Sequence, residues 1–89
     1  MEERLRTGDV VRHFKRQWDD PASADHLYKI LSTAVHSETK EKYIVYQGLY
    51  PPFEVYIRPY DMFMSEVDHQ KYPEASQKYR FEAVDPKDL

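Results

Sequence analysis

The feature that most constrains this chain is a series of short segments rich in aromatic and β-branched side chains. Residues 42–47, Lys-Tyr-Ile-Val-Tyr-Gln, are the clearest example. Side chains with a period of two point to opposite faces of a strand, and Tyr, Val and Ile fit a pleated, half-buried surface. Gly48 follows the segment directly. The pattern therefore predicts a β-strand with one buried face.

Similar segments recur at short intervals along the chain. Four further strands are predicted at residues 10–14, 27–35, 54–58 and 63–67. Pro59 indicates one short 3₁₀ or helical turn over 59–63, since proline suits a first helical position. Residues 79–84 are expected to form a last short ordered segment. Five short strands at this spacing predict a mainly β fold, a closed or partly open barrel.

The length of 89 residues leaves room for one folded domain. We expect a flexible lead-in over residues 1–7, a single β-barrel domain over 8–84 and a tail over 85–89. No stretch reaches the roughly 18 apolar residues needed to span a bilayer, and the charged start lacks the apolar centre of a secretory signal. The absence of cysteine excludes disulfides and thiolate sites. These features predict a cytoplasmic location with no membrane partner.

Composition and spacing also argue against several chemistries. The four histidines lack close metal-ligand spacing, so no metal site and no cofactor is predicted. Two glycines are too few for a glycine-rich phosphate loop, and no serine nucleophile motif is present, so no catalytic residue is indicated. Residues 12–16 form the one basic run. It could be a nucleic-acid patch, but the net charge of -3 favours the solvated face of a strand, which makes nucleic acid a less favoured partner.

An ordered set of motifs covers most of the chain. The motifs are His13-Phe14-Lys15, His36-Ser37-Glu38-Thr39, Val45-Tyr46, Leu49-Tyr50, Arg58-Pro59 with Met62-Phe63, and Arg80-Phe81. In this order they resemble a bacterial family known as domain of unknown function 1653. The resemblance implies a small SH3-like β-roll, and it implies no activity because that family has no assigned catalytic residues. The chain departs from the family pattern in a long loop over 16–25, which carries Trp18, and at Pro51-Pro52-Phe53.

Two polar features are open to a structural and a functional interpretation. The string His36-Ser37-Glu38-Thr39 suits a hairpin turn whose hydroxyls cap backbone N–H groups, which explains every residue except His36. Alternatively, His36 and Glu38 handle protons or bind a ligand. Arg58 either forms a structural ion pair, with Glu38 as one candidate partner, or binds an anion.

Aromatic side chains are unusually dense around the loop that follows residue 47. Tyr46, Tyr50, Phe53, Tyr56 and Tyr60 cannot all be buried in so small a domain. An ordinary tyrosine-rich core and rim is one interpretation. The other is an exposed groove of the kind that holds peptides or bases.

Three functions follow from these features. The favoured one is a non-catalytic binding module that uses an aromatic/Arg rim for a peptide, a protein or a small anionic ligand. Its candidate ligand-binding residues are His36, Glu38, Tyr46, Tyr50, Tyr56 and Arg58. One alternative is a small enzyme or metabolite-binding domain that uses His36, Glu38 and Arg58, which requires the three to converge on a pocket. The other is a structural or assembly unit that pairs through a sheet edge.

Overall fold

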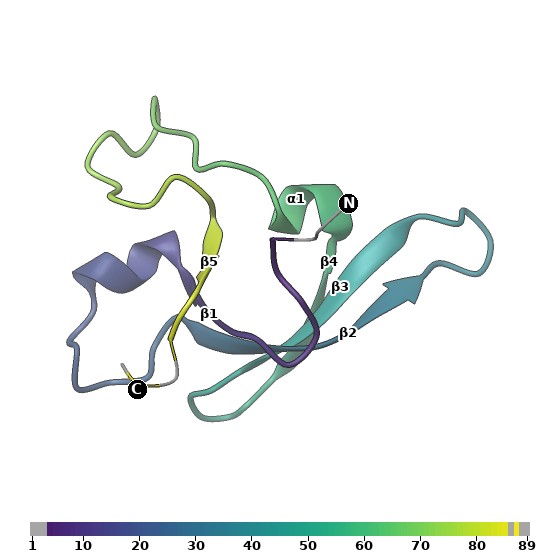
Figure 1. Cartoon of the computed structure of the whole chain (residues 1–89), viewed down its shortest axis with the longest axis horizontal. Helices are drawn as coiled ribbons and strands as arrows, with labels where there is room; N and C mark the ends of the chain where they lie inside the picture. Colours follow the sequence, from purple (N-terminus) through teal and green to yellow (C-terminus); the bar gives the residue numbers. More distant parts are fainter. Residues whose placement is uncertain (1–3, 86, 88–89) are drawn as a thin grey trace.

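The structure, a computed structural model, describes residues 4–85 and 87 and contains one five-stranded antiparallel sheet (Figure 1). The elements in chain order are β1 (Val10–His13), the 3₁₀ helix η1 (Phe14–Trp18), β2 (Leu27–Val35), β3 (Lys42–Gly48), β4 (Val55–Pro59), α1 (Tyr60–Phe63) and β5 (Phe81–Ala83). The predicted mainly β fold is confirmed. The helical turn predicted over 59–63 is confirmed as α1.

The strand order is β4-β3-β2-β1-β5, so β1 to β4 form a meander and β5 returns to pair with β1. This is the order of an SH3-like roll. The two edge strands, β4 and β5, do not pair with each other, so the sheet is the partly open form of the predicted barrel. The nine-residue β2 carries an irregularity between Ile30 and Ser32, and such a bulge bends a strand and increases its twist. The sheet therefore curls around its inner face, and the β2–β3 hairpin projects to one side (Figure 1).

The prediction of a strand over residues 63–67 is wrong. The fifth strand, β5, lies instead within the ordered segment predicted over 79–84. After α1, the N–H groups of Met64 and Ser65 bond back to Tyr60 O and Met62 O. These groups close the end of the helix, so they are not available to a strand ladder. The chain makes one isolated bridge, Glu66 to Tyr79, before β5 begins.

The first predicted strand ends one residue early because His13 caps a helix. Its Nδ1 accepts the Lys15 N–H at 3.1 Å, which starts η1 where the sequence predicted a loop. Trp18, at the end of η1, is 52% exposed and meets Phe14 edge to face at 6.4 Å. Phe14 in turn packs with Val67 and Ala75 in a small second cluster, so η1 is held against the long connection that precedes β5.

The main core is aromatic. Phe63 of α1 and Phe81 of β5 stack with ring centroids 4.0 Å apart and an angle of 6° between the rings. Tyr46 of β3 meets both rings edge to face. The other buried members of this cluster are Leu5, Val11, Tyr28, Ile30 and Ile44.

The ordered part of the molecule begins upstream of the domain boundary expected at residue 8. Leu5 is buried in the core, and Arg4 donates from Nη1 to Phe81 O at 2.7 Å, so this part of the expected lead-in is packed against β5. Residues 1–3 of that lead-in, and 86 and 88–89 of the expected tail, lie outside the described residues. Within the described part of the chain, neither helix has the length and apolar character that crossing a membrane requires.

The stacked rings of Phe63 and Phe81 predict where a substitution destabilises the fold most. Phe81→Ala should lower the free energy of unfolding by about 3–5 kcal/mol, because it removes a fully buried ring and leaves a cavity. Urea denaturation followed by tyrosine fluorescence measures the change. Phe53→Ala is the matched control, since Phe53 is half exposed and its loss should change stability by about 0.5 kcal/mol or less. Equal losses for the two variants would contradict this assignment of the core.

Candidate functional site

The structure brings together four of the six residues predicted as ligand-binding, and we call this group the aromatic/Arg rim: Tyr46, Tyr50, Tyr56 and Arg58. Tyr46 and Tyr56 are cross-strand partners in β3 and β4, with ring centroids 5.5 Å apart. Arg58 lies two residues beyond Tyr56, so both project from the same face of β4. Arg58 Nε donates to Tyr46 Oη at 3.4 Å, which ties the guanidinium to the rings.

Part of the rim belongs to the core. Tyr46 is only 5% exposed, whereas Tyr56 is 38% exposed and Tyr50 is partly buried. Tyr28, which was not among the predicted site residues, bonds through its hydroxyl to that of Tyr50 at 2.9 Å. Burial, together with this hydrogen bond, raises the pKa of Tyr28 above its ordinary value. The rim is therefore a fixed aromatic cluster with its outer edge at the surface.

The other two predicted residues, His36 and Glu38, lie at the turn of the β2–β3 hairpin. His36 Nδ1 accepts the N–H groups of Glu38 and Thr39 at 3.1 and 3.2 Å, and Thr39 Oγ1 accepts the Glu41 N–H at 3.2 Å. His36, the residue that the structural interpretation left unexplained, is thus the main cap of the turn. Local hydrogen bonding accounts for the conformation of the string.

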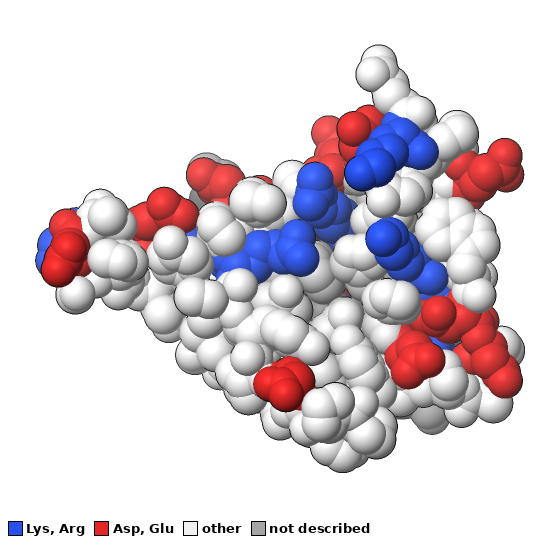
Figure 2. Space-filling view, turned by 180° about the vertical axis from the view of Figure 1, so that it is seen from behind, with Lys and Arg blue, Asp and Glu red and all other residues white. Residues whose placement is uncertain are grey.

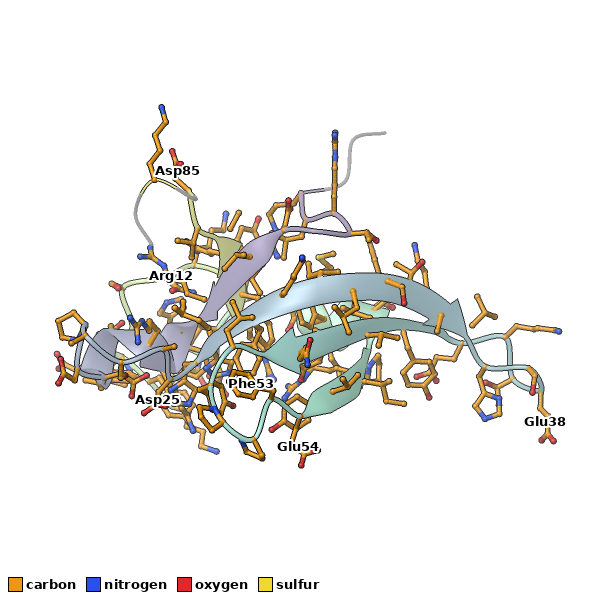
Figure 3. The ribbon with its side chains drawn as sticks, turned by 90° about the horizontal axis from the view of Figure 1, so that it is seen from below. Arg12, Asp25, Glu38, Phe53, Glu54 and Asp85 are labelled. Atoms are coloured by element: carbon orange, nitrogen blue, oxygen red, sulfur yellow. The ribbon has the colours of Figure 1, made fainter. Side chains whose placement is uncertain are left out.

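The hypothesis that Glu38 pairs with Arg58 is wrong. The β2–β3 hairpin extends beyond β4, whose last residue, Pro59, is opposite Tyr43. Figure 3 shows Glu38 at the outer end of this hairpin, pointing away from the rest of the molecule. Arg58 is opposite Ile44 on the inner face of the sheet, so its side chain extends toward the core side and not toward the turn.

Arg58 instead lines a surface hollow with a volume of about 330 Å³, which we call the basic hollow. Four cationic side chains line it: Lys15, Arg58, Lys71 and Arg80. The rest of its lining is His13, Phe14, Asp68 and Tyr72. The cations come from η1, β4, the connection between α1 and β5, and the residue just before β5. Figure 2 shows one face of the molecule on which Lys and Arg side chains gather toward the middle, with most acidic side chains near the edge.

None of the four cations makes an ion pair with a carboxylate among the described residues. Asp68, the single acid of the hollow, accepts the N–H groups of Gln70 and Lys71 at 3.1 and 3.3 Å through the same oxygen, Oδ1. Its carboxylate therefore holds the local backbone. Lys15 and Lys71 place their ammonium groups 5.4 and 5.5 Å from the centre of the Tyr72 ring, a cation–π arrangement.

The connection that carries Lys71 is fixed by side-chain hydrogen bonds, although it has little regular structure. Gln17 of η1 accepts the Ser76 N–H at 2.7 Å and donates to Glu74 O at 2.9 Å. Buried Gln77 donates to Arg12 O and Tyr79 O at 3.3 and 3.1 Å. These bonds attach the connection to η1 and β1, so two sides of the basic hollow are joined.

The pKa of His13 depends on its burial and on the charges around it. Burial, followed by the charges of His26, Arg58, Lys15 and Arg80, lowers the pKa of His13 from 6.5 to about 4. Because Nδ1 accepts the Lys15 N–H, the neutral imidazole carries its proton on Nε2. The ring is therefore a neutral donor beside four cations. This set of donors can bind an anion. No group of three metal-ligating side chains is found among the described residues.

Arg58 was predicted as a ligand-binding residue, whereas the other cations of the hollow were not. A partial signal existed, because the basic run 12–16 contains both His13 and Lys15. Lys71 lies more than 50 residues away in a polar stretch without a strand pattern, and Arg80 lies in the ordered segment predicted over 79–84, which was not predicted as part of a site.

Comparison with known proteins identifies a family without a described activity. The model of a family described as "Protein of unknown function (DUF1653)" matches residues 9–83, and the chain therefore belongs to this family. No curated protein and no solved structure matches the chain.

The lowered pKa of His13 predicts a specific pH dependence. The folded chain binds a proton less readily than the unfolded chain, so stability is fully present above pH 6.5 and is lost as the pH falls toward 4. His13→Asn keeps a good capping side chain but cannot titrate. Urea denaturation across this range should show a steeper loss for the wild type than for the variant. Parallel curves for the two chains would contradict the assignment.

Proposed function

We propose that this DUF1653 protein is a non-catalytic binding module that takes an anionic ligand in the basic hollow, beside the aromatic/Arg rim. One observation carries the proposal: Lys15, Arg58, Lys71 and Arg80 converge on one hollow with no ion-pair partner among the described residues. The chain as a whole has a net charge of -3, so this grouping does not follow from an excess of basic residues.

The electrostatics of the hollow favour an anionic ligand. Burial is the main cause of the low pKa of His13, and the charges of His26, Arg58, Lys15 and Arg80 lower it further. Like charges that share a partly enclosed site repel one another, and an anion in the hollow would relieve that repulsion. Arginine adds specificity, because its planar guanidinium can donate two parallel hydrogen bonds to one oxyanion. Arg58 is also held in place by Tyr46, which reduces the ordering cost of binding.

The enzyme or metabolite-binding alternative required His36, Glu38 and Arg58 in one pocket, whereas His36 and Glu38 lie at the β2–β3 turn and Arg58 lines the basic hollow. The assembly alternative has one supporting observation. On the outer face of the edge strand β4, Val55 and Ile57 are 53% and 65% exposed. Sedimentation of the pure protein tests this alternative, and a monomer at micromolar concentration would contradict it.

A bacterial source and a cytoplasmic location stay predictions.

Titration of the labelled protein with inorganic phosphate, sulfate and benzoate tests the proposed function. We expect backbone NMR shifts at Lys15, Lys71 and Arg80 for at least one anion. The double variant Lys15→Glu/Lys71→Glu should weaken the binding by about tenfold or more, because two attractive charges become repulsive. Lys29→Glu is the control, since Lys29 is exposed on β2 and does not line the hollow.

Two results would contradict the proposal. One is the absence of any NMR shift with all three anions. The other is a proline-rich peptide that shifts Tyr50 and Tyr56 when no anion binds, which would place the ligand on the rings alone.

A further inference from the structure

We infer that the ligand of the basic hollow is a small organic phosphate that presents a dianionic phosphate monoester. This inference rests on the proposed function, and it adds the chemical class of the ligand. Three features of the hollow carry it: the number of its donors, its balance of charge and its size.

The hollow offers more hydrogen-bond donors than the two oxygens of a carboxylate can accept from. Arg58 and Arg80 each offer a planar fork of N–H groups, and His13 adds an Nε2–H donor. One guanidinium fork already matches the two oxygens of a carboxylate. A phosphate monoester has three terminal oxygens, each a strong acceptor, and can engage donors that approach from several directions.

The charge balance favours a dianion over a monoanion. Four positive side chains face one carboxylate, that of Asp68, which is already bonded to backbone N–H groups. A phosphate monoester carries about two negative charges above its second pKa, near 6. A carboxylate, a sulfonate or a phosphodiester carries one, and would leave more of the repulsion among the cations unrelieved.

The size of the hollow indicates a small molecule larger than a bare ion. Its volume of about 330 Å³ lies at the lower end of the range for small-molecule sites, roughly 300–1,000 Å³. Phe14 and Tyr72 give part of the lining an aromatic surface, against which an organic group can pack.

The arrangement also differs from a polymer-binding surface. A nucleic acid strand presents one charge per phosphate along its length and needs basic side chains in a stripe. Here the basic side chains gather toward the middle of one face, and most acidic side chains lie near its edge (Figure 2). Cations that line one hollow suit a single compact group.

Phenyl phosphate, benzenesulfonate and benzoate share one phenyl ring and differ in their charged group. Comparing their affinities therefore separates the effect of ligand charge from that of apolar contact. Calorimetric titration at about pH 7.5, where the ester is a dianion, gives their affinities. We expect phenyl phosphate to bind about tenfold or more tightly than the other two. Lys71→Glu should weaken its binding by about tenfold, and Lys29→Glu should leave it unchanged.

An independent readout comes from His13. The bound dianion should raise the pKa of His13 from about 4, because it offsets the surrounding charges. Those charges come from His26 before β2, Arg58 in β4, Lys15 in η1 and Arg80 before β5. The connection adds two more charged groups to the lining of the hollow, Lys71 and Asp68. An NMR titration of the His13 ring with and without phenyl phosphate measures the shift, and Lys29→Glu again serves as the control.

The outcomes distinguish the two proposals. If benzoate or benzenesulfonate binds as tightly as phenyl phosphate, the anion site stands and the phosphate inference is overturned. If none of the three binds and the pKa of His13 does not move, the proposed function fails as well. A short single-stranded oligonucleotide that binds more tightly than phenyl phosphate would overturn the inference in favour of a nucleic-acid site.

Discussion

The ring of Phe81 is the contact on which the rest of this small domain depends. It stacks on Phe63 at 4.0 Å and meets Tyr46 at 5.6 Å, so a three-residue strand is joined to α1 and to the middle of the sheet. The same ring lies 5.1 Å from the His13 ring and 5.8 Å from the Arg58 guanidinium. The aromatic core and the basic hollow are therefore two sides of one packed cluster, and folding of the core positions the cations.

This arrangement explains how a thin domain can keep several like charges together. Mutual repulsion among the cations opposes folding, and the charges of Arg58, Lys15 and Arg80 add to the burial that lowers the pKa of His13. Burial of Phe63 and Phe81 offsets that cost, as does the stacking between them. Backbone bonds contribute too, since Arg80 N donates to Ser65 O and Phe14 N donates to Arg80 O. Arg80 is thus held between η1 and the connection by its main chain, while its side chain remains available to the hollow.

The sequence was most informative where a run of aromatic and β-branched residues marks a strand. Tyr43-Ile44-Val45-Tyr46 is such a run, and β3 spans Lys42–Gly48 with Ile44, Tyr46 and Gly48 buried. The prediction failed over 63–67, because backbone groups at the end of α1 were already bonded, which composition does not reveal. For the site, local chemistry was enough to identify the rim and Arg58. The hollow depends on contacts between residues far apart in the chain, such as Lys15 and Tyr72, and a single sequence contains no signal for them.

The side-chain amide of Gln17 has a consequence for the rate and the entropy of the proposed binding. It bonds to the main chain at Glu74 and Ser76, so η1, which carries Lys15, is tied to the connection that carries Lys71. If the proposed ligand binds there, these two segments are already joined, and less conformational freedom is lost on binding. Capture should accordingly proceed in one step at a rate governed by diffusion and electrostatic attraction, without a slow rearrangement beforehand.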